Sequence, residues 1–561
     1  MRRCAGLLLA VWLALAAPVQ AQPQSQPLDI GSDPALLARA ALGSDPGSAS
    51  VAVLRGDQLR VATVQRPAAD AAPQVAGAGP AELAPLYEIG SISKVFTGLL
   101  LAQAVERGEL SLSDTLGQRL QGKVAFASAA VAGITLEQLV THRSCLPRQF
   151  GGVRTGAAVV EQIRLADRAA LWAALAAQTL ARNAPCPALY SNYGLAVLAE
   201  LLAEHYGRPW SELVRDRITG PLGLQDMQLP LAEQRARLMP PFDGRRPAVA
   251  WEMQAFAGAG GLRSSAQDLA RFGRALVQGR NGPLGAAAER LVTPLAAYRG
   301  GQIGYAVFID GPPQRRTWSH DGLTGGYRAQ MTIYPDSAEV LVMLAANWQA
   351  PLSAVNTRLA ALRYPAQGTP ITADPQRLAE QAGVYRIDPE TVLVCVVHEG
   401  TLYVRATRGG FRAYLPVAAD TYIRPAGGAT LRFLRDGDRV ESVELAQYGR
   451  TLGATRSAEP PPQQAVLVAG AAADFVGRYQ VNRLFRAPIE FDVQEQDGQL
   501  VVRSSAVAVQ PVFPVAGRPD RFHYESPNAQ LQFERDAAGR VVALVLHENG
   551  ELRAVRVPAS P

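Results

Sequence analysis

The feature that most constrains the fold of this chain is an internal repeat in its C-terminal part. GTLYVRA (residues 400–406) matches GQLVVRS (498–504), and LRFLRDGDRVESVEL (431–445) matches LQFERDAAGRVVALVL (531–546). Each copy consists of short alternating strands with Gly or Asp turns, which predicts two small antiparallel β-barrels, over residues 375–458 and 472–558. Two copies are too few for a solenoid. AEPPPQQ, from Ala458 to Gln464, reads as a stiff linker between the barrels.

Upstream of the repeat, strand-like segments flank a helical middle. Residues 49–64 read as a hairpin, and residues 302–347 return to alternating, strand-like sequence. Between them, Ser265 is placed to cap a helix whose third residue is Asp268. This order predicts one α+β domain over residues 29–364, with a sheet built from strands of both ends.

The N-terminus has the pattern of a secretory signal. Arg2 and Arg3 precede an apolar run from Ala5 to Ala17, and Val19-Gln20-Ala21 forms a small-x-small cleavage site. We therefore expect residues 1–21 to be a cleaved signal peptide and the mature protein to be periplasmic or secreted. An uncleaved anchor is the alternative, although the run is short for a membrane span. No later stretch is long and charge-free enough to span a membrane, so we expect no integral span in the mature chain.

Composition and missing motifs exclude several function classes. The chain has 561 residues, 48% of them hydrophobic, and a formal net charge of +6. Its Arg residues are scattered, so we expect no nucleic-acid partner. The sequence contains no H-E-x-x-H, no Cys-x-x-Cys and no G-x-S-x-G, and its histidines lack ligand spacing. We therefore expect no metal, no cofactor and no α/β-hydrolase nucleophile.

Export would place the cysteines in an oxidising compartment. Cys145 and Cys186 both lie in Pro-flanked, loop-like sequence and are a candidate disulfide; two unpaired, partly buried thiols are the alternative. Cys395 lies inside the apolar run TVLVCVV and is interpreted as a core residue.

The chain contains two lysines, Lys94 and Lys123, and one of them follows a serine by three residues in YEIGSISKVFTGLLLA. Residues i and i+3 share a helix face, so Ser91 Oγ and Lys94 Nζ can meet across one turn. A neutral amine can take the proton of the serine, whereas a guanidinium cannot be deprotonated in a protein. Ser91 would also sit at a helix N-terminus, where free N–H groups favour negative charge on a substrate oxygen. An N-cap serine followed by a surface lysine is the alternative.

Two further motifs follow in order along the chain, Tyr190-Ser191-Asn192 and His320-Asp321-Gly322. The sequence Ser-x-x-Lys, Tyr-x-Asn, His-x-Gly resembles the serine β-lactamase and penicillin-binding superfamily, on its class C β-lactamase and D-aminopeptidase side. LEQLVTHRSCLPR (136–148), GPLGLQDM (220–227) and GAGGLRSSAQDLARF (258–272) are also similar to segments of that family. The resemblance covers roughly residues 29–362.

The resemblance implies a fold and a set of roles. The fold would be a class C β-lactamase-like domain, an antiparallel sheet flanked by helices plus an all-helical part, and the layout with two barrels is similar to three-domain D-aminopeptidases. Ser91 would be the acylated nucleophile, with Lys94 and Tyr190 shuttling its proton. His320 would stand where many relatives carry Lys. Asn192 would orient the substrate, and Gly322 would precede Leu323, whose N–H would complete an oxyanion hole with that of Ser91.

Each of these residues also has a structural interpretation. Tyr190 could pack in a core, Asn192 could cap a helix, and His320 could be a satisfied structural histidine. Two departures from the family pattern matter: Cys145 stands where relatives often carry Gly, and Asp321 stands where they often carry Thr or Ser. An ionised Asp321 would repel a substrate carboxylate and leaves room for an amine or an ester.

We therefore expect an exported serine hydrolase that cleaves an amide or ester bond through an acyl-enzyme on Ser91, a peptidase of the D-aminopeptidase or penicillin-binding type. One alternative is a β-lactamase that hydrolyses β-lactam antibiotics. Another is a penicillin-binding or sensor protein without turnover. The partner would be a small-molecule or peptide substrate, and the C-terminal barrels could contact cell wall or protein.

Overall fold

The computed structural model describes most of the chain from Asp33 to Pro558. The signal-like residues 1–21 and most of the expected linker between the barrels lie outside the described residues. The described ranges are 33–67, 73–75, 84–151, 157–186, 189–227, 236–298, 301–311, 316–363, 368–388, 391–398, 400–406, 412–424, 429–447, 450–458, 471–481, 489–496, 499–504, 507–515, 518–524, 530–547 and 551–558.

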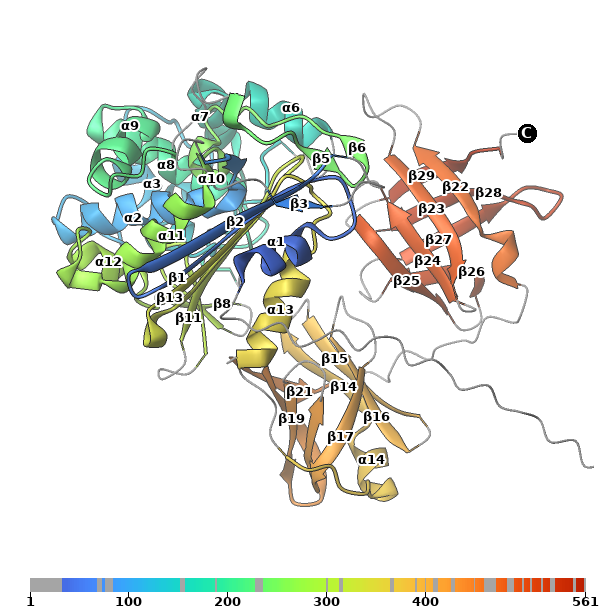
Figure 1. Cartoon of the computed structure of the whole chain (residues 1–561). Coiled ribbons are helices and arrows are strands. Elements are labelled where there is room, and N and C mark those ends of the chain that lie inside the picture. Colours follow the sequence, from blue (N-terminus) through green and yellow to red (C-terminus); the bar gives the residue numbers. More distant parts are fainter. Residues whose placement is uncertain are drawn as a thin grey trace, which may run out of the picture.

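A nine-stranded antiparallel sheet organises the first part of the chain (Figure 1). Its strand order is β3-β2-β1-β13-β12-β11-β10-β9-β8, so strands from the two ends of the domain meet where β1 pairs with β13. This is the arrangement that the strand-rich ends predict. The strands are β1 (Gly47–Arg55), β2 (Gln58–Arg66), β3 (Gln74–Val75), β8 (Ala296–Tyr298), β9 (Gly301–Ile303), β10 (Phe308–Asp310), β11 (Thr317–Leu323), β12 (Arg328–Tyr334) and β13 (Glu339–Ala345).

Helices cover both faces of this sheet, and the strand β13 shows why. All seven of its residues are buried. Val342 belongs to the large core that the helical part forms against one face, whereas its neighbour Met343 belongs to a smaller core on the other face. Successive strand residues point to opposite faces, so a continuous apolar run requires cover on both sides. Helices α1 (Pro34–Leu42) and α13 (Leu352–Arg363) supply the smaller core.

The larger core lies between the sheet and the helical part of the domain. Its helix α11 begins after Ser265, whose Oγ accepts from the N–H of Asp268 at 3.3 Å, which is the predicted cap. The helices and short strands of this part are α2 (Ser93–Glu106), α3 (Leu116–Arg119), α4 (Ala129–Ala132), α5 (Leu136–Val140), α6 (Ala157–Leu165), α7 (Arg168–Ala177), α8 (Asn192–Tyr206), α9 (Trp210–Val214), α10 (Ala257–Gly260), α11 (Ala266–Val277), α12 (Ala286–Leu291), β4 (Tyr87–Glu88), β5 (Phe242–Asp243), β6 (Arg246–Pro247) and β7 (Arg263–Ser264).

The C-terminal part forms two closed antiparallel barrels, as the repeat predicts. Strand β14 pairs with β21 to close the first barrel, and β22 pairs with β29 to close the second. Cys395 is buried in the core of the first barrel, as expected. The strands are β14 (Gly383–Asp388), β15 (Thr391–His398), β16 (Thr401–Ala406), β17 (Arg412–Ala418), β18 (Thr421–Arg424), β19 (Ala429–Asp436), β20 (Arg439–Gln447), β21 (Arg450–Arg456), β22 (Gly477–Val481), β23 (Ile489–Gln496), β24 (Gln499–Ser504), β25 (Val507–Val515), β26 (Arg518–Tyr524), β27 (Gln530–Arg535), β28 (Val541–His547) and β29 (Glu551–Arg556).

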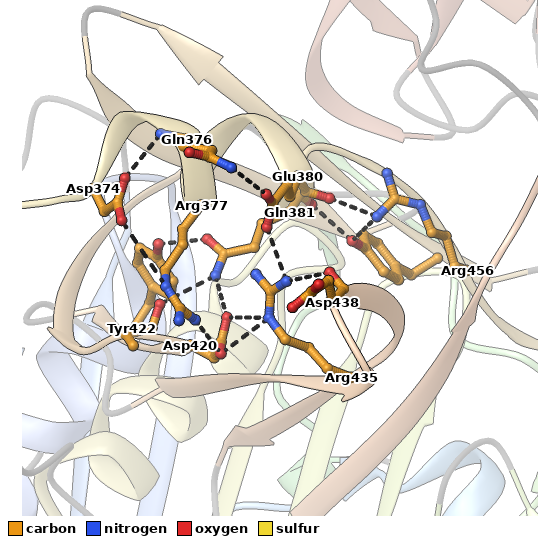
Figure 2. A network of polar contacts seen from close by, with 12 residues as sticks. Asp374, Gln376, Arg377, Glu380, Gln381, Asp420, Tyr422, Arg435, Asp438 and Arg456 are labelled. Atoms are coloured by element: carbon orange, nitrogen blue, oxygen red, sulfur yellow. Dashed lines mark hydrogen bonds and ion pairs between the residues drawn. The ribbon is translucent and has the colours of Figure 1, made fainter.

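A short helix precedes the first barrel and is fastened to it by a polar network (Figure 2). The helix is α14 (Pro375–Gln381), and its last residue is fully buried. Gln381 Nε2 donates to Asp420 at 2.8 Å, and the Gln381 side-chain oxygen accepts from the Tyr422 hydroxyl. Arg435 bonds both Asp420 and Glu380, at 3.0 and 2.9 Å. Buried polar groups must be paired, and this network pairs them while it holds the helix to the barrel.

The second barrel repeats two contacts of the first barrel on its own residues. Tyr385 donates its hydroxyl to the carbonyl oxygen of Gln381, four residues earlier, at 2.8 Å, and Tyr479 does the same to Phe475 at 2.7 Å. Arg435 pairs with Asp420, and Arg535 pairs with Asp520. The two copies therefore share their internal bonding as well as their strand pattern.

Both barrels contact the first domain. Strand β21 of the first barrel lies against β9, the neighbour of the edge strand β8 in the nine-stranded sheet. The second barrel lies on the side of the β5–β6 hairpin (Figure 1), where Arg246 pairs with Glu490 at 3.2 Å.

Candidate active site

Ser91 lies in the 3₁₀ turn Gly90–Ile92 that leads directly into helix α2. Gly90 has a φ of +51°, a left-handed conformation that favours glycine. Ser93 closes the turn, because its Oγ donates to the Gly90 carbonyl oxygen at 2.7 Å and accepts from the Leu262 N–H at 3.0 Å. The turn therefore holds Ser91 at the start of α2.

Lys94 is fully buried beside this serine. Its Nζ donates to Ser91 Oγ at 2.9 Å and to the carbonyl oxygen of Ala259 in α10 at 2.6 Å. Burial lowers the pKa of Lys94 well below its ordinary value; the positive charge of Arg148 lowers it further, and the negative charge of Asp321 opposes both. The geometry and the lowered pKa suit an amine that accepts the serine proton.

Tyr190 lies against both of these groups. Its hydroxyl is hydrogen-bonded to Ser91, and Lys94 Nζ lies 4.9 Å from the centre of its ring. Burial raises the pKa of Tyr190, which the Ser91 hydrogen bond and the charge of Arg148 oppose. The phenol therefore keeps its proton at neutral pH, so it is suited to relay or donate a proton and Lys94 is the better base.

His320 lies on β11, with its ring stacked on Phe308 and tilted toward that of Tyr190. Its ring centre is 4.7 Å from that of Phe308 and 6.5 Å from that of Tyr190. Burial lowers the pKa of His320 to about 4, so the imidazole is neutral at physiological pH. Nδ1 donates to the Asp321 carbonyl oxygen at 2.6 Å, which leaves Nε2 as an acceptor. In the described part of the chain this buried Nε2 has no hydrogen-bond partner, so the site can offer it to a substrate.

Strand β11 and the nucleophile turn are in direct backbone contact at Gly90 and Leu323. A Cβ on Gly90 would lie 2.7 Å from the Leu323 backbone nitrogen. Such close approach brings the backbone around Ser91 next to that of Leu323. These are the two segments whose N–H groups the family resemblance assigns to an oxyanion hole.

The Tyr-x-Asn motif opens helix α8, and here one interpretation from sequence is wrong. The N-cap of α8 is Ser191, whose Oγ accepts from the Gly194 N–H at 2.8 Å, and Asn192 is the first helical residue. Asn192 therefore does not cap the helix with its side chain, because the preceding serine already does so. Its backbone N–H donates to the Arg148 carbonyl oxygen at 3.0 Å.

A disulfide joins the two loops that carry these residues. Cys145 pairs with Cys186 across 41 residues of sequence. Between the same two loops, residues 142–148 and 186–192, here called the seam, Ser191 Oγ donates to the Pro147 carbonyl oxygen at 2.7 Å, and the Ser191 N–H donates to His142 Nδ1 at 3.2 Å. The His142 ring also packs against that of Tyr190, tilted by 33° with 4.3 Å between centres. The seam fixes the backbone on either side of Tyr190.

Asp321 is exposed and acts on the site through its charge. It opposes the lowering of the Lys94 pKa and reinforces the raising of the Tyr190 pKa. Its carboxylate is therefore near the reaction centre, although its neighbour His320 is buried and points to the other side of the strand.

Glu88 is a buried carboxylate that the sequence motifs do not mark. It lies two residues before Gly90, the first residue of the Ser91 turn, pairs with Arg263 at 3.5 Å and accepts from the Trp251 N–H at 2.7 Å. Burial raises the pKa of Glu88 to about 7, against the opposing effects of Thr324 and Arg263. The carboxylate thus joins three separate segments beneath the site.

Within the described ranges, no cluster of three or more His, Cys, Asp or Glu residues is arranged to hold a metal ion. No helix among those residues is long and apolar enough to cross a membrane.

Comparison with known proteins identifies the family of the first domain. The family model named Beta-lactamase matches residues 40–364, more than half of the chain. The chain belongs to the beta-lactamase family. It is a serine β-lactamase-fold hydrolase, and the predicted superfamily and fold class are confirmed.

The individual relatives match only part of the chain, at about 30% sequence identity or less. The chain is 31% identical over 192 residues to the D-alanyl-D-alanine-carboxypeptidase/endopeptidase AmpH of Escherichia coli strain K12, which covers 34% of this chain and 49% of AmpH. It therefore spans about half the length of that relative. It is 28% identical over 285 residues to penicillin-binding protein 4 of Amycolatopsis lactamdurans, covering 46% of this chain and 71% of the relative. A D-stereospecific amidohydrolase from Streptomyces sp. is a structural neighbour, with a TM-score of 0.47, 23% identity, and coverage of 58% and 98%.

Sequence reasoning brought together Ser91, Lys94, Tyr190 and His320, and the structure places them around one point. It missed the Ala259 carbonyl oxygen that holds Lys94, which lies within the GAGG segment. It also missed Glu88 and Arg148. Glu88 could have been found as an acidic residue next to a buried tyrosine in YEIGS, whereas nothing in the sequence distinguishes Arg148 from other arginines.

Proposed function

We propose that this chain is an exported serine peptidase of the D-aminopeptidase or penicillin-binding type, which cleaves an amide bond through an acyl-enzyme on Ser91. The observation that carries the proposal is the 2.9 Å contact between Ser91 Oγ and the buried amine of Lys94. A serine hydroxyl is a weak nucleophile until a base lies within hydrogen-bond reach.

The geometry supports a definite order of proton transfers. Lys94, kept neutral by burial, takes the Ser91 proton as Oγ attacks the substrate carbonyl carbon, and the backbone N–H groups of Ser91 and Leu323 receive the developing oxyanion. Collapse of the tetrahedral intermediate breaks the C–N bond. The Tyr190 phenol donates its proton to the leaving nitrogen and regains one from the Lys94 ammonium. Water then attacks the acyl carbon and gives a proton to Lys94, the bond between that carbon and Ser91 Oγ breaks, and Oγ regains the proton from Lys94 as the acid leaves.

Charge near the reaction centre favours an amine on the substrate. Asp321 is exposed and close enough to affect the Lys94 pKa. An ionised carboxylate attracts an ammonium group and repels an acidic one. A peptide with a free D-amino terminus fits this charge.

Two observations support export of the protein. The disulfide between Cys145 and Cys186 suits an oxidising compartment, and the first 21 residues have the pattern of a signal peptide. N-terminal sequencing of protein recovered from a periplasmic extract tests this part: a mature end near Gln22 agrees with export, and an intact Met1 contradicts it.

The central experiment is intact-mass analysis after brief exposure to a fluorophosphonate, and separately to a penicillin and to a D-alanine anilide. Wild type should gain the phosphonyl mass, Ser91→Ala should not, and the anilide should be cleaved. If neither protein is labelled, the result contradicts the hydrolase mechanism. Hydrolysed penicillin without an adduct would favour the β-lactamase alternative, and a lasting penicillin adduct without anilide cleavage would favour a penicillin-binding protein without turnover.

A further inference from the structure

Arg148 is an exposed cation at the edge of the catalytic cluster. Its guanidinium carbon lies 5.1 Å from the centre of the Tyr190 ring, the ring that Lys94 also approaches at 4.9 Å. Its positive charge reaches both reacting groups, because it lowers the pKa of Lys94 and of Tyr190. A group that approaches Ser91 past Tyr190 therefore enters the field of Arg148.

No carboxylate lies within ion-pair distance of Arg148 in the part of the chain that the structure describes. Two other arginines of the same domain have such partners: Arg263 pairs with Glu88 at 3.5 Å, and Arg237 pairs with Asp226 at 2.7 Å. Asp321 acts on the same amine and phenol but is not paired with Arg148. The site thus presents two separate exposed charges, the Arg148 guanidinium and the Asp321 carboxylate.

The backbone of Arg148 is held in place although its side chain is exposed. Its carbonyl oxygen accepts from the N–H groups of Asn192 and Tyr193, at 3.0 and 3.2 Å. The disulfide between Cys145 and Cys186 closes the same seam three residues earlier. The guanidinium is therefore presented from a fixed point beside Tyr190, which lowers the entropy lost when it binds a ligand.

We propose that Arg148 is a specificity-determining residue that binds a carboxylate of the substrate next to the scissile amide. This inference rests on the proposed function and narrows its substrates to peptides that carry a negative charge near the cleaved bond as well as an amine. A guanidinium presents a planar fork of donors that matches a carboxylate, and such charge-assisted bonds are the stronger ones. The ring of Tyr190 behind the guanidinium orients that fork.

Matched substrate pairs that differ in one charge test the proposal. One pair is the anilides of D-glutamate and D-glutamine, which vary the acyl part. The other is D-alanine joined to 4-aminobenzoate or to 4-aminobenzamide, which varies the leaving group. The readout is the ratio of kcat/KM within each pair, measured at low and high salt for wild type, Arg148→Gln and Arg148→Glu. Arg182→Gln is the control, because Arg182 is also exposed and, among the described residues, makes no hydrogen bond or ion pair with Ser91, Lys94 or Tyr190.

Wild type and Arg182→Gln should prefer the carboxylate member of at least one pair by roughly tenfold or more, a typical effect of a hydrogen bond to a charged group. Arg148→Gln should bring that ratio close to one, Arg148→Glu should reverse it, and high salt should weaken it. The pair that responds identifies the side of the bond that Arg148 contacts. Equal rates in wild type for both pairs, or an unchanged ratio in Arg148→Gln, would overturn the proposal.

A failure of the proposed peptidase activity can be distinguished from a failure of the role proposed for Arg148. In that case Ser91 still reacts with fluorophosphonate while none of the four substrates is cleaved. The comparison is then made between two fluorophosphonates whose chains end in a carboxylate or in the matching amide. Faster labelling by the carboxylate probe in wild type but not in Arg148→Gln supports the role of Arg148, and equal labelling rates overturn it.

Discussion

A Cβ on Gly322 would lie 1.9 Å from the carbonyl oxygen of Ile89, so strand β11 and the segment before the nucleophile touch backbone to backbone. No side chain fits between them. The contact sets the distance between the Ser91 turn and the Leu323 N–H, and hence the width of the oxyanion hole that we propose for these two segments.

Gly322→Ala should therefore reduce acylation of Ser91 by roughly a hundredfold or more, since losing one oxyanion donor has an effect of that size. The measurement is the rate of fluorophosphonate labelling by intact mass. Gly453→Ala is the matched control, because a Cβ there meets nothing within 4 Å. Equal labelling rates for the two variants would show that β11 can move away without cost.

Lys94→Arg should abolish the base while it keeps a positive charge. A guanidinium cannot take the Ser91 proton, so labelling should slow by about two orders of magnitude or more. The chain supplies its own control in Lys123, which is exposed and pairs with Glu204 at 3.1 Å. Lys123→Arg should label at the wild-type rate. A Lys94→Arg variant that labels as fast as wild type would move the role of base to Tyr190.

The sequence predicts those parts of the site whose chemistry depends on the side chain. Ser91, Lys94 and His320 could be found because few residue types can act as nucleophile, neutral amine or neutral imidazole. The Ala259 carbonyl oxygen could not be found, because every residue has one and its position depends on how α10 packs against α2. Arg148 is one of many arginines, and the fold alone places it over Tyr190.

The same contrast holds for the fold. Alternating strands and an internal repeat were enough to predict both barrels. Helix α14 was not predicted, because its seven residues are too few for a clear helical period. Its place is set by long-range contacts such as the bond between Gln381 and Asp420.

Removal of the disulfide should destabilise the first domain and loosen the site. Its closure of a 41-residue separation corresponds to about 4 kcal/mol in the chain-entropy model. The double variant Cys145→Ala/Cys186→Ala should unfold at lower denaturant and label more slowly with fluorophosphonate, because the loop before Tyr190 is then less constrained. Cys395→Ala serves as a control for thiol loss outside this domain. Unchanged labelling in the double variant would mean that the hydrogen bonds of Ser191 suffice to hold the loop.

The buried Glu88 should make stability depend on pH. Its pKa is raised from 4.5 to about 7, so between these values the folded chain keeps a proton that the unfolded chain has released. Stability therefore falls as the pH rises from about 4.5 to 7, by about 3 kcal/mol at most, and this contribution is constant outside that window.

Thermal unfolding of wild type and Glu88→Gln at several pH values between 4.5 and 8 measures this contribution. At pH 4.5, where Glu88 of the folded wild type is protonated, Glu88→Gln should be about as stable as wild type, because both side chains are then neutral. As the pH rises toward 7, wild type should lose stability and the variant should not, so the variant becomes the more stable of the two. A difference that stays constant with pH would show that Glu88 is ionised throughout.

The stability of each barrel should depend on one arginine in its own last strand, Arg456 in β21 and Arg556 in β29. Arg456 donates to the carbonyl oxygens of Glu380 and Ala382 at 2.6 and 2.7 Å, and Arg556 donates to that of Val476 at 2.6 Å in the second barrel. Truncation leaves these acceptors without their partner, which costs about 1–3 kcal/mol per buried group. Arg456→Ala should therefore speed amide hydrogen exchange in β14 and β15.

The same variant should leave exchange in the second barrel and labelling of Ser91 unchanged, because each barrel has its own core. Arg556→Ala should show the reverse pattern, with faster exchange in β22 and β23. Arg439→Ala removes an exposed arginine from the first barrel and should change neither. If Arg456→Ala speeds exchange in both barrels equally, then the two copies unfold as one cooperative unit, and the duplication has produced a joint structure in place of two independent domains.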